Sequence, residues 1–307
     1  LFIGDVGRPD LLASFGVASL DCRQDGAKLG GPRPAYLFNT TIAGIDDADA
    51  ILLIGTNPRR EAPIVNARIR KSWLRHPLAI ARIGAPADLT YPVTELGESL
   101  DALGKLAAGE GAFFETLKNA KRPMLILGQS VLARPDGAAI LAAAAKLAGA
   151  TGMIGPEGAE GWCGFNVLHD AAGRVGALDV GFLPGAGGRD VAGILDGASK
   201  GEIDLVWLLG ADEIDTSKLG KAFVVYQGSH GDAGAHRADV ILPGAAYTEE
   251  PGLFVNTEGR VQAANRAVFP PGEARENWRI VRAVSGLAGK PLPYDDLPAL
   301  RAALVAA

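Results

Sequence analysis

The 307-residue sequence is poor in cysteine, and this limits the chemistry that it can support. Its two cysteines, Cys22 and Cys163, lie far apart and form no CxxC pattern. Because iron–sulfur clusters normally take four cysteine ligands, two thiols cannot hold such a cluster by themselves. One disulfide is the alternative, but nothing else indicates an oxidising compartment, so we expect two reduced, partly buried thiols.

Long apolar runs and an excess of basic charge are also missing. The best apolar candidate, residues 138–148, is short and contains Lys146, so it is not expected to span a bilayer. The net charge of −5 argues against the basic stripe of a nucleic-acid-binding surface. The chain has neither a signal peptide nor an initial Met and opens on a strand-like run at residues 1–4, which favours a piece of a longer polypeptide.

What the sequence does contain is glycine, at 41 residues, with only 6% aromatic residues. Glycine permits the unusual backbone angles of tight strand-to-helix turns, so this composition favours α/β layers. Apolar residues make up 48% and charged residues 21%, the balance of an ordinary globular protein. The length suits about two domains.

Five short apolar runs, each ending at a turn residue, predict strands that are buried on both faces, as in parallel sheets. They span residues 51–55, 79–84, 124–128, 205–210 and 223–227. Helical periodicity lies between them, around residues 65–73, 100–106 and 140–147. This alternation predicts an α/β fold of two doubly wound, Rossmann-like halves.

A weak internal repeat supports two related halves. Residues 47–58 and 202–213 each contain an acidic lead-in, a buried strand, a glycine and a small polar turn. Each glycine therefore stands at the end of a strand, where an α/β protein places its strand-to-helix turn.

The domain boundary is expected where polar residues and a proline precede a new strand, at residues 119–123. We therefore expect a first domain over residues 1–118, a second over 119–290, and a helical tail over 291–307. The glycine-rich residues 152–188 show little periodicity, so they are expected to form long loops or short helical pieces at the surface.

One turn is a candidate for binding an anion: Gly55, Thr56, Asn57 and Pro58 follow a strand and open a helix near Pro63. Free amides at a helix start favour an anion, so this turn can cradle a pyrophosphate. The local pattern favours the competing interpretation, a plain turn in which Asn57 caps the helix and a proline begins it. Neither GxGxxG nor GxxxxGK[ST] occurs, so the dinucleotide and P-loop interpretations lack support.

Polar residues also follow the strand at 223–227, among them His230, Asp232, His236 and Asp239. Their spacing matches no usual zinc pattern, so a polar loop is favoured over a metal site. Ser229 lies in no GxSxG elbow, which argues against a catalytic triad.

The most distinctive segment covers residues 239–260. It predicts a buried strand that stops at a proline, then an extended segment that closes on a Glu-Gly turn. The arginine at its end, Arg260, can bind a phosphate or carboxylate in a bidentate manner. Pairing with Glu258 or Glu249 is the commoner arrangement for such an arginine.

Several of these segments occur in the same order in molybdopterin oxidoreductases, and the sequence resembles that family. They are Gly55-Thr56-Asn57-Pro58 with Pro63, residues 238–243, residues 256–260, and residues 271–274 with Trp278. Further segments resemble the complex I branch, the family of the largest peripheral-arm subunit of NADH–quinone oxidoreductases (the mitochondrial 75 kDa type and its bacterial counterpart). These are residues 21–26, 39–44, 61–71, 88–91, 136–139 and 226–232. The matches run from about Asp21 to Tyr294, and their number and order make them specific.

This resemblance implies a scaffold of the formate dehydrogenase and DMSO reductase type that has lost its catalysis. Active relatives carry a Cys, selenocysteine or Ser that binds the metal, and that position falls near Ala27, whose methyl group cannot coordinate a metal. We therefore expect no catalytic residue, no metal ligand, no molybdenum and no intact cofactor site. Vestiges of the pocket are expected at Gly55, Thr56, Asn57, Pro58, Gly210, Asp212, Asn256 and Arg260.

In that family the full subunit carries its iron–sulfur clusters in an amino-terminal portion, whose cysteine motifs are absent here. The resemblance implies a non-catalytic structural region of the electron-input arm, packed against other complex I subunits and without nucleic acid. It also implies a peripheral place at the inner or cell membrane, without insertion, on the cytoplasmic or matrix side. Two alternatives stay open: an active molybdopterin-dependent fragment, and a nucleotide-binding module with a ligand near Gly55 and Gly210.

Overall fold

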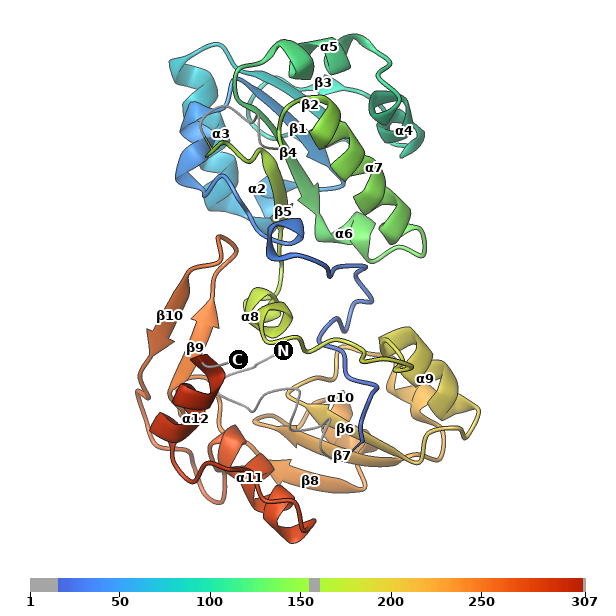
Figure 1. Cartoon of the computed structure of the whole chain (residues 1–307), viewed down its shortest axis with the longest axis vertical. Coiled ribbons are helices and arrows are strands. Elements are labelled where there is room, and N and C mark those ends of the chain that lie inside the picture. Colours follow the sequence, from blue (N-terminus) through green and yellow to red (C-terminus); the bar gives the residue numbers. More distant parts are fainter. Residues whose placement is uncertain (1–15, 155–160, 306–307) are drawn as a thin grey trace. The chain divides into compact units, whose positions relative to one another are not determined.

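The computed structural model describes residues 16–154 and 161–305, and the chain forms two compact units (Figure 1). Unit 1 consists of Leu1–Gly26, Ala171–Asn256 and Arg260–Ala307. Unit 2 consists of Ala27–Asp170 and Thr257–Gly259. The strand expected at residues 1–4 lies outside the described residues.

The described part of unit 2 contains a five-stranded parallel sheet in the order β3-β2-β1-β4-β5. Its strands are β1 (Ala50–Ile54), β2 (Ala79–Ile83), β3 (Thr94–Glu95), β4 (Pro123–Gly128) and β5 (Phe165–Leu168). Strand β1 lies in the centre, with Ile51 opposite Ile80 on one side and Met124 on the other. All of its residues are buried, which explains the continuous apolar run.

Helices cover both faces of this sheet. On one face, Val65 and Ile69 of α3 pack in a core with Ile51 and Leu53 of β1. Helices α4, α5 and α7 lie on the opposite face (Figure 1). The described helices of unit 2, 3-10 helices being marked η, are η1 (Arg33–Ala35), η2 (Ala43–Asp47), α2 (Pro58–Glu61), α3 (Pro63–Arg75), α4 (Asp101–Ala107), α5 (Ala112–Asn119), α6 (Gln129–Leu132) and α7 (Gly137–Ala150).

Unit 1 contains a smaller parallel sheet in the order β6-β7-β8 and an antiparallel hairpin of β9 and β10. The strands are β6 (Leu205–Leu209), β7 (Phe223–Gly228), β8 (Val240–Pro243), β9 (Gly252–Val255) and β10 (Val261–Ala264). The described helices are α8 (Arg174–Asp179), α9 (Val191–Ser199), η4 (Thr216–Leu219), α10 (Ala233–Arg237), α11 (Asn277–Leu287) and α12 (Leu297–Val305).

The parallel sheet of unit 1 is covered on two faces, but, against the prediction, its strands β6 and β7 are only partly buried, because Leu205 and Phe223 are exposed. Val206 and Leu208 of β6 belong to a core that includes Ala198 of α9. Trp207, on the other face of the same strand, packs in a core with Trp278 of α11. Both sheets are therefore doubly wound, as the alternation of strands and helices predicts.

The predicted strands and helices are found, but β8, predicted to be buried, consists mostly of exposed residues. The predicted domain boundary is wrong. Strand β4 pairs along its length with β1, so residues 119–123 connect α5 to a strand of the same sheet. The predicted tail is also part of unit 1, because Leu300 of α12 packs in one core with Trp278. A proline after polar residues marks a turn, and it does not show which sheet the next strand joins.

The glycine-rich residues 152–188 contain more structure than expected. Helix α8 is one of the short helical pieces predicted, but β5 is a buried strand inside this region. With four residues and an asparagine in its middle, β5 lacks the apolar run that marks β1, β4 and β6. Residues 155–160 lie outside the described part of the chain.

The internal repeat has a structural counterpart. Gly55 and Gly210 each follow the first strand of a parallel pair and have almost the same φ, +56° and +57°. The Gly55 amide donates to Ile83 O at 2.8 Å, and the Gly210 amide donates to Gln227 O at 2.7 Å. The two halves thus repeat a strand, its parallel neighbour and the glycine turn at its end.

Candidate functional site

The turn after β1 can be followed atom by atom. Gly55 adopts positive φ, and a Cβ added there would lie 2.1 Å from a methyl carbon of Val131, so only glycine fits. Its carbonyl accepts a hydrogen bond from the Ser130 hydroxyl at 2.7 Å. Pro58 begins the short helix α2, and Pro63 begins α3, as the sequence predicts.

The carboxylate of Glu61 accepts the hydrogen bond of the Asn57 amide, the amide that a bound anion would require. Its carboxylate accepts a hydrogen bond from the Asn57 amide at 2.8 Å and another from the buried Thr56 hydroxyl. The Asn57 side chain makes no capping hydrogen bond, so its predicted capping role is wrong. The turn therefore already has a negative group of its own chain at the position where a phosphate would bind.

The equivalent turn after β6 is also held by side chains of its own unit. Asp212 accepts a hydrogen bond from the Gly234 amide in the first turn of α10, at 3.1 Å. The Glu213 amide donates to the side-chain oxygen of Gln24 at 2.9 Å. Both strand-end turns thus have backbone amides paired with side chains of the protein.

The predicted pocket residues divide between the two units. Gly55, Thr56, Asn57 and Pro58 belong to unit 2. Gly210, Asp212, Asn256 and Arg260 belong to unit 1. Asn256 and Arg260 meet each other: the Arg260 amide donates to Asn256 Oδ1 at 2.9 Å, and the Asn256 amide donates to Arg260 O at 3.0 Å.

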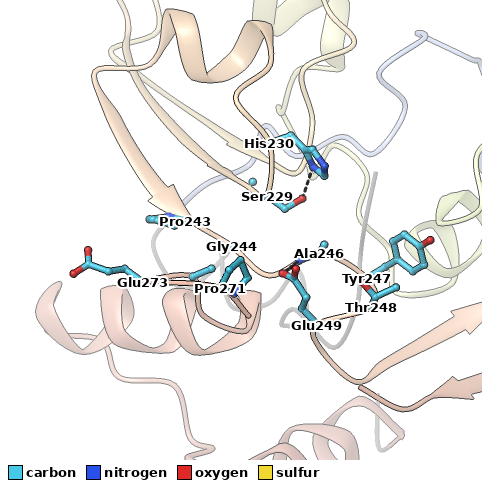
Figure 2. Close-up of a pocket in the computed structure, with 12 residues that line it drawn as sticks. Ser229, His230, Pro243, Gly244, Ala246, Tyr247, Thr248, Glu249, Pro271 and Glu273 are labelled. Atoms are coloured by element: carbon cyan, nitrogen blue, oxygen red, sulfur yellow. Dashed lines mark hydrogen bonds between the residues drawn. The ribbon is translucent and has the colours of Figure 1, made fainter. Parts of the chain in front are cut away.

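Unit 1 contains a pocket of about 510 Å³ at the ends of β7 and β8 (Figure 2). Its walls come from three segments that the sequence analysis singled out, around Gly228, Pro243 and Pro271. Carboxyl ends of parallel strands are where α/β proteins commonly bind ligands. The structure therefore brings together motifs that are up to 46 residues apart, from residue 228 to residue 274.

The polar groups of this pocket do not form a catalytic arrangement. The Ser229 hydroxyl and His230 Nδ1 are 2.9 Å apart, as the dashed line in Figure 2 marks. In the described structure no carboxylate accepts a hydrogen bond from the His230 ring, so no third group orients this pair. Glu249, on the opposite wall, accepts a hydrogen bond from the Ala246 amide at 2.9 Å and supports the turn after β8.

A second cavity of unit 1, of about 420 Å³, is mostly apolar and runs beside β6. Asp21 and Gln24 line its wall, but both side chains make hydrogen bonds or ion pairs within unit 1. Asp21 pairs with Arg23 at 2.7 Å and accepts a hydrogen bond from the Val191 amide, while Gln24 holds the Glu213 amide. We therefore assign these polar groups to the stability of unit 1 and not to the binding of a ligand.

The residues near the expected metal-binding position are poor ligands. Ala27 is fully buried and offers only a methyl group. Burial raises the pKa of the Cys22 thiol to about 11, although the nearby Arg174 guanidinium acts in the opposite direction. Such a thiol is protonated at neutral pH, whereas metal coordination requires the thiolate. Asp25 pairs with the buried Arg174 at 2.9 Å.

Both cysteines are free thiols, as predicted.

Neither a cluster of metal ligands nor a membrane-spanning helix occurs among the described residues. No group of three or more His, Cys, Asp or Glu side chains is arranged to hold a metal ion within residues 16–154 and 161–305. Within the same residues, no helix has the length and apolar character required to cross a bilayer.

Comparison with known proteins settles the family. A protein-family model described as molybdopterin oxidoreductase matches residues 9–287. The chain belongs to the molybdopterin oxidoreductase family. Two mitochondrial relatives are NADH-ubiquinone oxidoreductase 78 kDa subunits, 48% identical over 88% of this chain in Candida albicans and 47% over 89% in Neurospora crassa. The G subunit of the NADH-quinone oxidoreductase of Rickettsia bellii is 44% identical over 88% of this chain.

These relatives confirm the resemblance to the complex I branch of the molybdopterin oxidoreductase family. The matched part covers 35% of each fungal protein and 37% of the Rickettsia protein, so this chain spans about a third of their length. The family name implies a molybdenum–pterin cofactor, but the residues described here do not fit one. Ala27 offers no ligand, Cys22 is a protonated thiol, and Glu61 accepts the hydrogen bond of the Asn57 amide in the turn after β1.

Two features of the site were missed in the sequence. The role of Glu61 follows from its position four residues after Asn57, a spacing that puts a side chain back over the start of a helix. The pocket in Figure 2 had no local signal, because its walls meet only after the sheet of unit 1 has formed.

Proposed function

We propose that this chain is a non-catalytic structural region of the peripheral, electron-input arm of an NADH:quinone oxidoreductase. The observation that carries the proposal is its 44–48% identity, over nearly nine-tenths of its length, to subunits of that name. In this proposal its role is to pack against other subunits of the arm and to support the polypeptide that carries the iron–sulfur clusters. Electrons pass from NADH to quinone without entering this region.

The poor fit of its residues to a molybdenum cofactor supports the same proposal. An active member of the family needs a metal ligand and free amides for the phosphates of the pterin. Ala27 provides no metal ligand, and the Asn57 amide is not free because Glu61 accepts its hydrogen bond. The alternative, an active molybdopterin-dependent fragment of the formate dehydrogenase type, agrees with the family match, but Ala27 and Glu61 argue against it. In our proposal the chain holds no molybdenum, and its place at the membrane is peripheral, on the cytoplasmic or matrix side.

The proposal is tested in the assembled complex with the variant Glu61→Ala. Removing this carboxylate leaves the Asn57 amide and the Thr56 hydroxyl without their acceptor, so stability or the yield of assembled complex should fall. Turnover per assembled complex should stay unchanged, because no electron passes through the turn. Glu115→Ala is the control, since Glu115 is an exposed carboxylate of α5 in the same unit.

Two results would contradict the proposal. One is a normally assembled Glu61→Ala complex whose turnover is lost. The other is molybdenum or tungsten in stoichiometric amount in elemental analysis of the purified protein, assigned to this region by its loss when the region is deleted.

A further inference from the structure

Strand β6 of unit 1 repeats β1 of unit 2 in more than its glycine turn. Each strand also has a hydrogen bond at its amino end. The Ala79 amide of β2 donates to Asp49 O, just before β1, at 3.2 Å. The Phe223 amide of β7 donates to Asp204 O, just before β6, at 2.8 Å. The pair β6–β7 therefore has the same register as the pair β1–β2, as expected for an internal repeat.

The correspondence ends on the other side of β6. Strand β1 has a second parallel neighbour, β4, which pairs with it from Ala50 to Ile54. Strand β6 has no second neighbour within the described residues, where the sheet order is β6-β7-β8. The other described strands of unit 1, β9 and β10, pair with each other. The repeat therefore leaves β6 without the counterpart of β4.

The backbone of β6 presents unpaired groups on this side. Successive residues of a strand direct their N–H and C=O groups to opposite neighbours. Asp204 O and the Gly210 amide bond to β7. The groups of Leu205, Trp207 and Leu209 therefore point away from β7, and within residues 16–154 and 161–305 they have no backbone hydrogen bond to another segment. We call these N–H and C=O groups the β6 edge, and such an edge is a template for pairing with a further strand.

An apolar cavity runs along the β6 edge. This cavity, of about 420 Å³, is lined by all five residues of β6 and also by residues 16–21. Residues 16–21 are held by another part of unit 1, since the Gly185 amide donates to Ala18 O at 2.9 Å. Protein interiors leave few voids larger than a water molecule. An apolar cavity of this size beside an unpaired edge therefore indicates the place of a further strand.

Strand β4 shows which sequence fits such a place. All of its residues are buried, and its apolar run ends at Gly128. Gly128 lies beside Gly55, and a Cβ on Gly128 would be 2.2 Å from Gly55 O. Gly210 has almost the same φ as Gly55, so the same close approach is expected beside Gly210. The strand that pairs with β6 is therefore apolar on both faces and has a glycine beside Gly210.

We propose that the β6 edge binds a parallel strand of this chemistry, supplied by the part of the same subunit that lies outside residues 1–307. The inference rests on the proposed function, because it takes the chain as part of a subunit like its relatives, of which it spans about a third. The strand belongs to the same polypeptide because its counterpart β4 lies in one chain with β1. Main-chain hydrogen bonds to the β6 edge hold it, and its apolar side chains fill the cavity.

The test uses the natural subunit, purified in the assembly that it forms, and measures amide hydrogen exchange at single-residue resolution. The amides of Leu205, Trp207 and Leu209 should exchange at least about a hundredfold more slowly than unstructured amides. The amide of Leu52, which faces β4 in unit 2, is the reference for a paired amide. An amide at an unpaired edge would exchange much faster than this reference.

A crosslink identifies the source of the strand. Leu205 is replaced by the photoreactive residue p-benzoylphenylalanine, because its side chain is 55% exposed and the replacement removes little packing. Irradiation should join residue 205 to a peptide of the same subunit, outside residues 1–307, that contains an apolar run ending in glycine. The subunit should keep its single-chain mass on a denaturing gel. The matched control is the same replacement at Val240, 39% exposed in β8 at the opposite edge of the sheet, which should not capture that peptide.

The proposal is overturned if the amides of the β6 edge exchange as fast as unstructured ones. It is also overturned if residue 205 is joined to a peptide of residues 1–307, to another subunit, or to no peptide. Mass spectrometry of the same assembly tests the proposed function separately. If other NADH:quinone oxidoreductase subunits are absent from it, that function is wrong, whereas exchange and crosslinking in the same sample still decide whether a strand pairs with β6.

Discussion

The buried thiol of Cys22 makes stability depend on pH in a way that can be worked out from its surroundings. The residue is 1% exposed, and burial raises its pKa from 9.0 to about 11. That rise corresponds to about 2.7 kcal/mol, since each tenfold change in the acid constant is worth about 1.4 kcal/mol. The folded state therefore disfavours the thiolate by this amount.

The direction follows from proton linkage. Below pH 9 the thiol is protonated in the folded and unfolded chain alike, so the full stability is present. Between about pH 9 and 11 the unfolded chain loses the proton while the folded chain keeps it, and stability falls. By pH 10.5 the loss attributable to Cys22 should reach about 2 kcal/mol.

The assay is urea unfolding from pH 8 to 10.5 under reducing conditions, followed by tryptophan fluorescence. Cys22→Ala is measured in parallel, because Cys163, the lysines and the tyrosines titrate in both proteins and cancel in the difference. The free energy of unfolding of the wild type, minus that of Cys22→Ala, should fall by about 2 kcal/mol across this range. A difference that stays constant with pH would refute the assignment of a raised pKa to this thiol.

Further predictions concern packing and buried hydrogen bonds. Gly128→Ala should destabilise the chain by more than about 2 kcal/mol in urea unfolding, because its Cβ would lie 2.2 Å from the carbonyl oxygen of Gly55. Gly149→Ala, in open space within α7, should instead raise stability by about 0.5–1 kcal/mol, and an equal loss in both variants would contradict the argument. Tyr91→Phe should cost about 1–3 kcal/mol by the same measurement, since Asn66 Oδ1 would lose the buried bond that Tyr91 donates at 2.8 Å; an unchanged stability would show that this bond contributes nothing.

Much of the local structure was predictable because it depends on short stretches of sequence. A continuous apolar run that ends in glycine is sufficient to identify β1, β4 and β6. Strands β1 and β4 are buried on both faces and have no polar side, whereas every second residue of β6 is at least partly exposed. The glycine turns were predictable for the same reason: Gly55 and Gly210 are needed where φ is positive. The family could also be identified from the sequence, because its motifs occur in the same order along the chain.

Strand β5 shows where this reasoning fails. Its Asn166 is fully buried, which a local pattern counts against a strand. The side chain is accommodated because it donates to Leu125 O and Gly164 O, both at 3.2 Å, and its oxygen accepts the Thr40 amide at 3.0 Å. Leu125 and Thr40 come from other parts of the chain, so the sequence near residue 166 contains no sign of these two partners.

Arg82, in the predicted strand β2, also shows that local sequence does not reveal the partners of a buried polar side chain. A charged residue within an apolar run is expected to reach solvent, yet this side chain is 1% exposed. It is buried because its guanidinium pairs with Glu95 of the neighbouring β3 and donates to Ala87 O at 3.1 Å. A buried charge is tolerated only when such partners are present, and they are supplied by pairing between strands.

The sequence by itself determined the α/β class, the strands with apolar runs, the glycine turns and the family, because each of these depends on neighbouring residues or on their order. Only the tertiary structure decided that β4 joins β1 in one sheet and that Thr257–Gly259 belongs to unit 2. It also decided that the Glu61 carboxylate accepts the hydrogen bond of the Asn57 amide in the turn after β1. These outcomes depend on hydrogen bonds whose partners are chosen by folding, and a short stretch of sequence does not specify which partner that will be.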